Sequence, residues 1–512
     1  MTIRKRILLT ALAVAVCGLW PSAAQAAPGD LDPSFGGGGK ATLNPGSGED
    51  GAGDVAIQPD GKIVVAGWDS DDDEFVLARY LTNGTLDASF GGGDGIASTD
   101  LLSYGAIALT PDGSIMVASG DGDFILARFT SAGALDTSFG GGDGIVQIGF
   151  SGNDYASDII RQSDGKLLVS GEGGPAEDFA LARFNADGTL DTSFGGGDGK
   201  VTTDFGSYDW TSGLALQQDG KIVAVGGTLF GGVPANESDF AVVRYQSNGS
   251  LDTGFSGDGK VTLGFDGFDS ASSAAIQPNG KVVVGGTGVL AGKMHVTLVR
   301  YLANGTLDPG FGGGDGIVTN DLGPFGSNVS DLVLQPDGRI VTGGYGGEAA
   351  EDFLIVRYNP SGSLDTTFGG GDGWATADFT GLGNFDAASA LALQQDGKIV
   401  AVGTAANRNT SPFDDELALA RFEGGGAPPA EKEDPGPPSE ETPSQPPSGG
   451  GSTAPPPVST PPTGSAVPKL NAKKKLAQKK ARARKRALKK CRKLKRKAQR
   501  KKCIRRVRRS AK

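Results

Sequence analysis

Residues 190–199 read LDTSFGGGDG, a turn followed by a glycine-rich loop, and this stretch decides the fold. Its Leu-Asp-x-x-Phe pattern occurs once in each of seven units of about 55 to 60 residues. The leucine and phenylalanine of the seven copies are Leu31 and Phe35, Leu86 and Phe90, Leu135 and Phe139, Leu190 and Phe194, Leu251 and Phe255, Leu307 and Phe311, and Leu364 and Phe368. A period of this length indicates stacked structural repeats, because one unit alone cannot bury its apolar face.

An Asp-Gly or Asn-Gly pair between two apolar runs is the second landmark of every unit. Such a pair is the strongest short-range signal for a β-hairpin, since a type I′ turn requires positive φ at both central residues. The first residue of the pair is Asp60, Asp112, Asp164, Asp219, Asn279, Asp337 or Asp396. A β-branched run such as 63–65 leaves the turn, and a run that ends in arginine and an aromatic residue follows, as at 75–80. We therefore expect four short strands and no helix in each unit.

Seven units of four strands predict an all-β fold, a seven-bladed β-propeller, followed by a disordered linker and a basic tail. A long all-β solenoid is the alternative that a repeat of this kind leaves open. The ring is favoured because the chain begins with the glycine-loop strand near 40–43 and ends on the arginine strand at 417–422. The first strand could then complete the last blade and leave no unpaired sheet edge.

Three motifs of the unit resemble a known family. Leu-Asp-x-x-Phe-Gly-Gly-Gly-Asp-Gly, Gln-Pro-Asp-Gly-Lys-Ile-Val-Val at 58–65 and Phe-x-Leu-Ala-Arg-Tyr at 75–80 are similar to the delta-60 repeat of bacterial β-propeller proteins. The resemblance covers residues 31–422 and implies a secreted propeller. It brings no catalytic motif and no ligand, because the family is defined by its repeat.

The chain divides by composition into four parts. Residues 1–26 indicate a secretory signal peptide, because three basic residues at 4–6 precede an apolar run and a small-residue cleavage site. Residues 27–423 hold the repeats, 424–466 are rich in Pro, Gly and Ser and predict a disordered linker, and 467–512 form a tail rich in Lys and Arg. No later segment is apolar enough to span a bilayer. We expect a secreted monomer that is associated with the cell surface.

Charge is divided sharply between the repeats and the tail. Residues 27–423 carry 19 Lys and Arg against 54 Asp and Glu, whereas residues 469–512 carry 25 Lys and Arg and no acid. A polybasic segment binds polyanions through counterion release, so we expect an anionic cell-envelope polymer or another extracellular polyanion as its partner. The residues expected to make this contact are Lys473, Lys474, Lys475, Arg484, Lys485, Arg486, Arg505 and Arg506. The alternative is a tail that folds back on the acidic propeller.

One aspartate and one arginine recur in every unit, and we expect them to pair blade by blade. The aspartates are Asp32, Asp87, Asp136, Asp191, Asp252, Asp308 and Asp365, and the arginines are Arg79, Arg128, Arg183, Arg244, Arg300, Arg357 and Arg421. A charge-assisted contact between them would hold the turn of each blade. The alternative is that the arginines are exposed and lie over the strand surface. Residues shared by all seven units are expected to support the fold rather than to form an active site.

Composition restricts the chemistry that the repeats can carry. His295 is the one histidine and the repeats contain no cysteine, which excludes Ser-His-Asp, Cys-His and zinc sites of the usual kind. No catalytic residue and no cofactor is assigned. The Gly-Gly-Gly-Asp-Gly loops predict structural turns, with calcium as the alternative, because hard cations bind carboxylate and carbonyl oxygens. Trp68, Trp210 and Trp374 are expected to pack between blades, with a sugar or peptide groove as the alternative.

These features favour a non-enzymatic exported binding or scaffold module. Its propeller would present a surface to an unknown ligand, and the unshared loops 69–74, 229–238 and 405–416 are candidates for recognition. The basic tail would attach it electrostatically to the envelope. A glycan hydrolase or lyase that uses carboxylates in the propeller channel is the alternative. A purely structural envelope protein is the third possibility.

Overall fold

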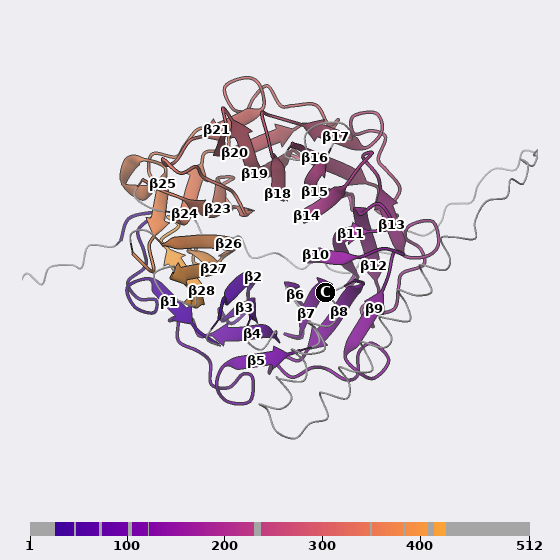
Figure 1. The fold of residues 1–512 in the computed structure, drawn as a ribbon, viewed down its shortest axis with the longest axis horizontal. Helices are drawn as coiled ribbons and strands as arrows, with labels where there is room; N and C mark the ends of the chain where they lie inside the picture. The colour runs from indigo at the N-terminus through magenta and orange to yellow at the C-terminus, as the bar shows by residue number, and fades with distance from the viewer. Residues whose placement is uncertain are drawn as a thin grey trace, which may run out of the picture. The chain divides into compact units, whose positions relative to one another are not determined.

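In a computed structural model of the chain, the described residues form 28 strands, arranged in seven four-stranded antiparallel sheets around a common axis (Figure 1). The structure describes residues 26–425 except 46–47, 71–73, 101–104, 121, 230–236, 349–350, 382–383 and 408–413. The predicted seven-bladed propeller is therefore confirmed, and a solenoid is excluded because the sheets close into a ring.

Each of the first six blades consists of four consecutive strands, the first nearest the axis and the last at the rim (Figure 1). Blade 1 has β2 (Gly51–Ile57), β3 (Ile63–Asp69), β4 (Glu74–Tyr80) and β5 (Ile96–Thr99); blade 2 has β6 (Gly105–Leu109), β7 (Ile115–Gly120), β8 (Phe124–Phe129) and β9 (Ile145–Ile148). Blade 3 has β10 (Tyr155–Arg161), β11 (Leu167–Gly173), β12 (Asp178–Phe184) and β13 (Lys200–Thr203); blade 4 has β14 (Asp209–Leu216), β15 (Ile222–Leu229), β16 (Ser238–Tyr245) and β17 (Lys260–Leu263). Blade 5 has β18 (Ser270–Ile276), β19 (Val282–Leu290), β20 (Lys293–Tyr301) and β21 (Ile317–Asn320); blade 6 has β22 (Asp331–Leu334), β23 (Ile340–Gly346), β24 (Asp352–Tyr358) and β25 (Trp374–Ala377), preceded by a short 3₁₀ turn, η1 (Gly369–Gly371).

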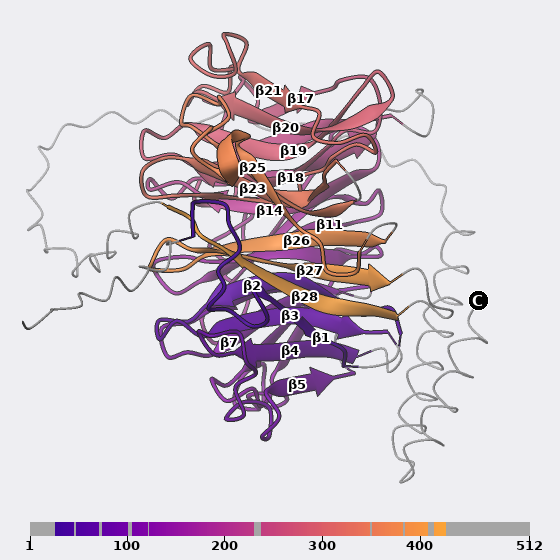
Figure 2. The ribbon, with the colours of Figure 1, turned by 90° about the vertical axis from the view of Figure 1, so that its left-hand side faces the viewer.

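The seventh blade joins the two ends of the described chain. It consists of β26 (Phe385–Leu393), β27 (Ile399–Asn407), β28 (Asp414–Phe422) and, at the rim, the first strand β1 (Lys40–Leu43). β1 and β28 lie side by side in Figure 2 and pair antiparallel, with Lys40 opposite Ala420. Two further backbone hydrogen bonds extend the joint: Gly29 N–H donates to the Glu423 carbonyl at 2.7 Å, and Glu423 N–H donates to the Asp30 carbonyl at 2.9 Å. The predicted closure by the first strand is confirmed.

The hairpin turns and inner strands follow from local sequence. Gly61 in the first Asp-Gly turn has a φ of 82°, a conformation that glycine adopts without steric cost. In five blades the inner strand carries a β-bulge near its middle, for example between Ala52 and Asp54 in β2. A bulge sets two residues against one on the partner strand, so consecutive residues such as Gly53 and Asp54 both reach the axis.

The hydrophobic core lies between neighbouring blades. One cluster combines Val64, Phe75 and Phe90 of blade 1 with Ile107 and Val117 of blade 2. The phenylalanine of every Leu-Asp-x-x-Phe copy is at most 1% exposed. Burial of a side chain of this size contributes about 1.5–3 kcal/mol, which explains why each unit retains it.

The chain separates into two compact units, Met1–Glu431 and Lys432–Lys512. The 28 strands found in the described residues belong to the first unit. The predicted signal peptide up to residue 25, the linker beyond residue 425 and the tail with Lys473 to Arg506 lie outside the described residues. Within residues 26–425 and their stated gaps, no helix has the length and apolar character needed to cross a membrane.

Candidate functional site

The seven arginines of the repeat each contact one repeat aspartate. The guanidinium Nε donates to a carboxylate oxygen at 2.7–2.9 Å. The pairs are Arg79–Asp87, Arg128–Asp136, Arg183–Asp191, Arg244–Asp252, Arg300–Asp308, Arg357–Asp365 and Arg421–Asp32. Six partners lie eight residues after their arginine, at the start of the following repeat unit, and the seventh comes from the N-terminus. The structure thus brings together one aspartate and one arginine per blade, and a blade spans the boundary between two sequence units.

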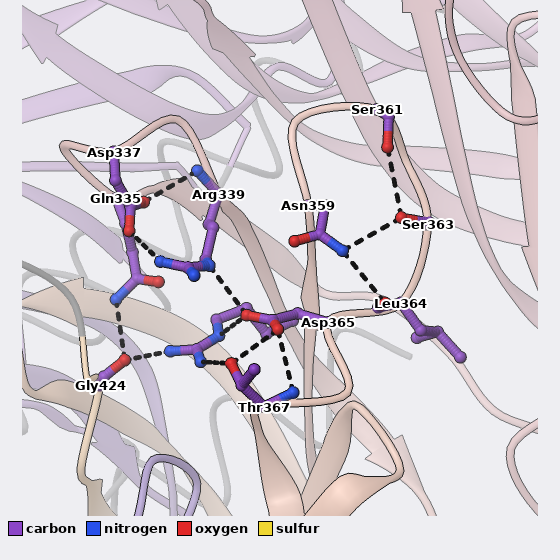
Figure 3. Close-up of polar contacts among 11 residues, drawn as sticks. Gln335, Asp337, Arg339, Asn359, Ser361, Ser363, Leu364, Asp365, Thr367 and Gly424 are labelled. Carbon is purple, nitrogen blue, oxygen red and sulfur yellow. Dashed lines mark hydrogen bonds and ion pairs between the residues drawn. The ribbon is translucent and has the colours of Figure 1, made fainter.

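Each guanidinium also stacks on the phenylalanine of its repeat, and five of the seven contact the next blade. Arg183 Nη1 donates to the Ser247 carbonyl of blade 4, and the guanidinium carbon lies 4.5 Å from the centre of the Phe194 ring. Arg357 makes the same polar contacts between blades 6 and 7, to Asp365 and to the carbonyl of Gly424, which are both labelled in Figure 3. Stacking over a ring face adds a cation–π attraction. The arginine therefore joins neighbouring blades as well as holding its own turn.

A third charged residue, which the sequence analysis missed, belongs to this arrangement. In six blades a basic residue directly follows the Asp-Gly or Asn-Gly pair and lies 2.7–3.5 Å from the same carboxylate. These residues are Lys62, Lys166, Lys221, Lys281, Arg339 and Lys398. Blade 2 has Ser114 at this position. We call the arginine, its aspartate, this basic residue and the phenylalanine the blade clamp.

The aspartates of the blade clamp are held in the ionised state. Hydrogen bonds from Ser89 hold the pKa of Asp87 well below its usual range, and Lys62 and Arg79 lower it further against the opposing effect of burial. Carboxylates that receive several donors and face cations keep their charge even in acid. The blade clamp is therefore a stable structural ion pair and a poor source of exchangeable protons.

Three other aspartates converge on the axis of the ring. Asp54 in β2, Asp158 in β10 and Asp331 in β22 occupy one repeat position, six residues before the first residue of the hairpin pair. Together with small residues of the other blades they line a central cavity of about 280 Å³. The other blades place Ala106, Gly213, Ser273 and Ala390 at this position.

Both carboxylate oxygens of each channel aspartate accept backbone N–H groups. Asp54 accepts the N–H of Val55 at 2.7 Å and, across the blade boundary, the N–H of Ile107 at 2.6 Å. The corresponding donors are Ile159 and Leu214 for Asp158, and Leu332, Leu391 and the Ser273 hydroxyl for Asp331. Each channel aspartate therefore ties its blade to the next one.

Burial raises the pKa of Asp54 to about 8, that of Asp158 to about 7 and that of Asp331 to about 6. The negative charges of Asp158 and Asp331 add to the rise at Asp54. Near neutral pH the channel therefore holds both protonated and ionised carboxyl groups, which is typical of sites that exchange protons or bind cations. In the sequence, the available signal was an aspartate at the same repeat position in three of the seven units. Only the closed ring shows that these three side chains line one cavity.

Two further carboxylate groups lie where the rim strand of one blade leads to the inner strand of the next. Within the described residues, each group holds three carboxylates with oxygens within 4.8 Å of one another: Asp178, Asp204 and Asp209, and Asp352, Asp378 and Asp386. Burial raises the pKa of Asp352 to about 6, and the charges of Asp378 and Asp386 add to this rise. Oxygen ligands in this arrangement suit a hard cation such as calcium.

The glycine loops contain a different carboxylate contact. Asp94 accepts the N–H of Ile96 at 3.0 Å, and Asp143, Asp198 and Asp315 accept the N–H two residues later in the same way. A side chain that bonds its own backbone two residues on is a turn-forming device. This geometry supports the expected structural turn, and calcium at these loops stays a prediction.

The remaining candidates lie apart from these carboxylates. His295 in β20 is half-buried, and its Nδ1 lies 2.9 Å from the Lys293 carbonyl oxygen. Trp374 packs against the core between blades 5 and 6, as expected, whereas Trp210 stacks on Phe268 at a ring separation of 5.7 Å. The unshared loops at 69–74, 229–238 and 405–416 lie partly outside the described residues.

The ring of seven four-stranded sheets, with one arginine–aspartate pair in every blade, defines the protein as a seven-bladed β-propeller. The chain carries repeats of a known model, described as the domain of unknown function (DUF5122) beta-propeller. The matched residues are 58–90, 110–139, 162–194, 217–255, 277–311 and 335–368. The name delta-60 for this repeat stays a prediction.

Comparison with curated proteins found no match. Among solved structures, the chain is similar to virginiamycin B lyase from Staphylococcus aureus, with 10% identity, 74% of this chain and 98% of that chain covered, and a TM-score of 0.38. A protein of unknown function from Dyadobacter fermentans shows 11% identity, coverage of 76% and 100%, and a TM-score of 0.41. The polysaccharide lyase Uly1 shows 11% identity, coverage of 78% and 94%, and a TM-score of 0.40. These likenesses say nothing about activity.

Proposed function

We propose that this protein is a non-enzymatic exported binding or scaffold module, with a propeller that presents a ligand-binding surface and a basic tail that attaches it to anionic envelope polymers. The observation that carries the first half is the channel. Both oxygens of Asp54 are bonded to backbone N–H groups of two blades, and those of Asp158 and Asp331 are bonded alike. One such bond on each oxygen leaves further lone pairs free, but it fixes the carboxyl group between two blades, and this favours a structural role. The channel carboxylates hold the ring together.

The second half of the proposal rests on charge. The segment 469–512 carries 25 cations and no acid, whereas residues 27–423 carry an excess of acids. A polycation of this kind binds a polyanion with an affinity that falls steeply with salt. Attachment through the tail leaves the propeller surface available to its own ligand.

The test compares the mature chain with a form that ends at Ser465, for binding to isolated cell envelopes and to DNA across a salt series. We expect only the mature chain to bind, with affinity lost between 50 and 200 mM salt by a factor of about 10³ or more. Equal binding by both forms would contradict attachment through the tail and assign recognition to the propeller.

A glycan hydrolase or lyase in the channel is the second candidate, and one observation favours it. The pKa of Asp158 is raised to about 7, which is suited to general acid or base work at neutral pH. Incubation of the mature chain with neutral and anionic polysaccharides tests this candidate. Release of reducing or unsaturated ends that is abolished in Asp158→Asn would replace the binding module by an enzyme.

A further inference from the structure

Aromatic side chains gather at the end of the channel where the inner strands of blades 3 to 5 begin. We call Tyr155, Tyr208, Trp210 and Phe268 the aromatic patch. Trp210 is near two other rings: Phe268 stacks at 5.7 Å with an interplanar angle of 11°, and Tyr208 lies at 5.6 Å with an angle of 36°. Tyr155 is 39% and Phe268 is 51% exposed. Tyr155 begins β10, Tyr208 and Trp210 lie at the start of β14, and Phe268 lies two residues before β18; these inner strands are neighbours around the axis (Figure 1).

The backbone beneath the patch fixes its rings. Gly227 in β15 pairs with Trp210, and a Cβ on Gly227 would lie 2.2 Å from the indole ring, so the indole packs flat on this glycine. Phe268 forms a parallel bridge to Ser238 of blade 4. The rings are therefore positioned by two different blades before any ligand arrives, which lowers the entropy that binding must cost.

Two glutamates accompany the aromatic patch. Glu172 lies directly opposite Tyr155 in the β10–β11 pairing and accepts the Tyr208 hydroxyl at 3.0 Å. Glu177 has a φ of 59°, a left-handed conformation that is uncommon for a residue with a side chain, and its carbonyl accepts the N–H of Asp209 at 2.9 Å. Within the described part of the chain, neither glutamate makes a salt bridge. Burial raises the pKa of Glu172, and the charge of Glu177 adds to the rise.

We propose that the aromatic patch, with Glu172, binds the lysine or arginine side chain of a basic peptide from a partner protein. This inference rests on the proposed binding function and gives it a face of the propeller and a ligand chemistry. A cation against the exposed part of the Tyr155 or Phe268 ring gains a cation–π attraction, and it also supplies the countercharge that Glu172 and Glu177 lack. A neutral sugar would stack on the same rings and leave both carboxylates uncompensated, so the charge favours the cation.

The experiment titrates the mature chain with a short capped peptide that holds one arginine and one lysine between glycines, and follows binding by calorimetry. Phe268→Ala should weaken binding about three-fold, the factor expected for an exposed cation–π contact, while Phe325→Ala should leave it unchanged. Phe325 is 62% exposed and lies outside the patch, so it is the matched control for loss of an exposed ring. Both variants should fold, because both rings are exposed.

Charge is tested with a second matched pair. Glu172→Gln should weaken binding several-fold, while Asp258→Asn, which removes one exposed charge from the glycine loop of blade 4, should not. If Glu172→Gln and Asp258→Asn weaken peptide binding equally, the binding depends on the overall negative charge of the propeller and not on Glu172. This result would overturn the inference. Binding of a neutral oligosaccharide that is lost in Phe268→Ala and kept in Glu172→Gln would replace the cation by a sugar.

Two outcomes separate this inference from the proposed function. If the peptide binds the form ending at Ser465 but not the mature chain, the tail itself occupies the aromatic patch. This result would overturn the inference that the patch binds a peptide from a partner protein. The truncated form is a fair comparison because it keeps residues 40–422, which hold the strands of the described part of the chain. No peptide binding to either form, with envelope binding retained, would refute the inference alone. Loss of both peptide binding and envelope binding would also refute the proposed function as a binding module.

Discussion

Replacing Arg183 with leucine should lower the free energy of unfolding by about 3 kcal/mol, because it removes one partner of a buried ion pair. Arg183 is 7% and Asp191 is 6% exposed, and their contact is 2.7 Å long. Loss of a buried partner typically costs 3–5 kcal/mol. The lower end applies here, because Asp191 keeps Lys166 at 3.1 Å and the donors of Ser193.

The matched control is Arg128→Leu at the same repeat position in blade 2. The side chains of Arg128 and Asp136 are 23% and 20% exposed, and no basic residue follows the Asp-Gly turn of this blade. A solvent-exposed pair contributes about 0.2–1 kcal/mol. Arg183→Leu should therefore cost several times more than Arg128→Leu, although both variants lose the same repeat arginine.

Urea unfolding followed by fluorescence measures both variants, and the double variant Arg183→Leu/Asp191→Leu completes a mutant cycle. We expect part of the stability lost in Arg183→Leu to return in the double variant, since no unpaired charge then stays buried. Equal shifts for Arg183→Leu and Arg128→Leu would refute the reasoning, because burial could not then be what gives the clamp its strength.

Three more predictions concern the ring joint and the raised pKa values. Asp32→Ala should lower the thermal midpoint more than Asp87→Ala and expose the first strand to protease, since Asp32 holds Arg421 across the joint; equal midpoints would contradict this. The free energy of unfolding of the native protein should fall as pH rises from about 4 to 8. Asp54 has a pKa of about 8 in the folded state, so it keeps its proton there, whereas the unfolded chain releases this proton near pH 4. Asp54→Asn should flatten that slope in urea midpoints at pH 5 and 8, and an unchanged slope would assign it to other groups. Asp352→Asn should raise the thermal midpoint at pH 7 in EDTA, because it removes a partly buried charge: burial raises the pKa of Asp352 to about 6, and repulsion from Asp378 and Asp386 adds to the rise. A native midpoint that calcium raises, with no such rise in the variant, would instead make this group a cation site.

Repetition made the fold and the clamp partners predictable. Seven aspartates and seven arginines at fixed positions already predicted one pair per blade, and the Asp-Gly turns predicted where strands reverse. The basic residue after the turn, such as Lys62, is present in six units but was not predicted as a partner of the aspartate. In the sequence, 24 residues of hairpin and loop lie between Lys62 and Asp87, so their contact is visible only in the folded blade. Local sequence patterns predict where strands lie, but they do not predict which side chains contact one another across strands.

The channel and the aromatic patch could not be predicted in the same way. Asp54, Asp158 and Asp331 share a repeat position, but a bulge accompanies it in β2 and β10 and not in β22, so no local sequence pattern shows that the three side chains line one cavity. Trp210 and Phe268 occupy different positions in different units, so no period connects them. Only the rotation from one blade to the next brings their rings together.

The joint between β1 and β28 has a consequence for how the chain is made. Blades 1 to 6 can each form from consecutive residues as they are synthesised. The seventh blade needs β1, which is made first, and it cannot be completed before residue 422 has been made. Entropy resists this meeting only weakly, because the cost of closing a loop grows with the logarithm of its length. Until it happens, the growing molecule has unpaired sheet edges, which are templates for association with other chains. The last blade therefore keeps an open edge until residue 422 has been made, and a chain that is terminated before β28 is distinguishable from a longer one by this edge.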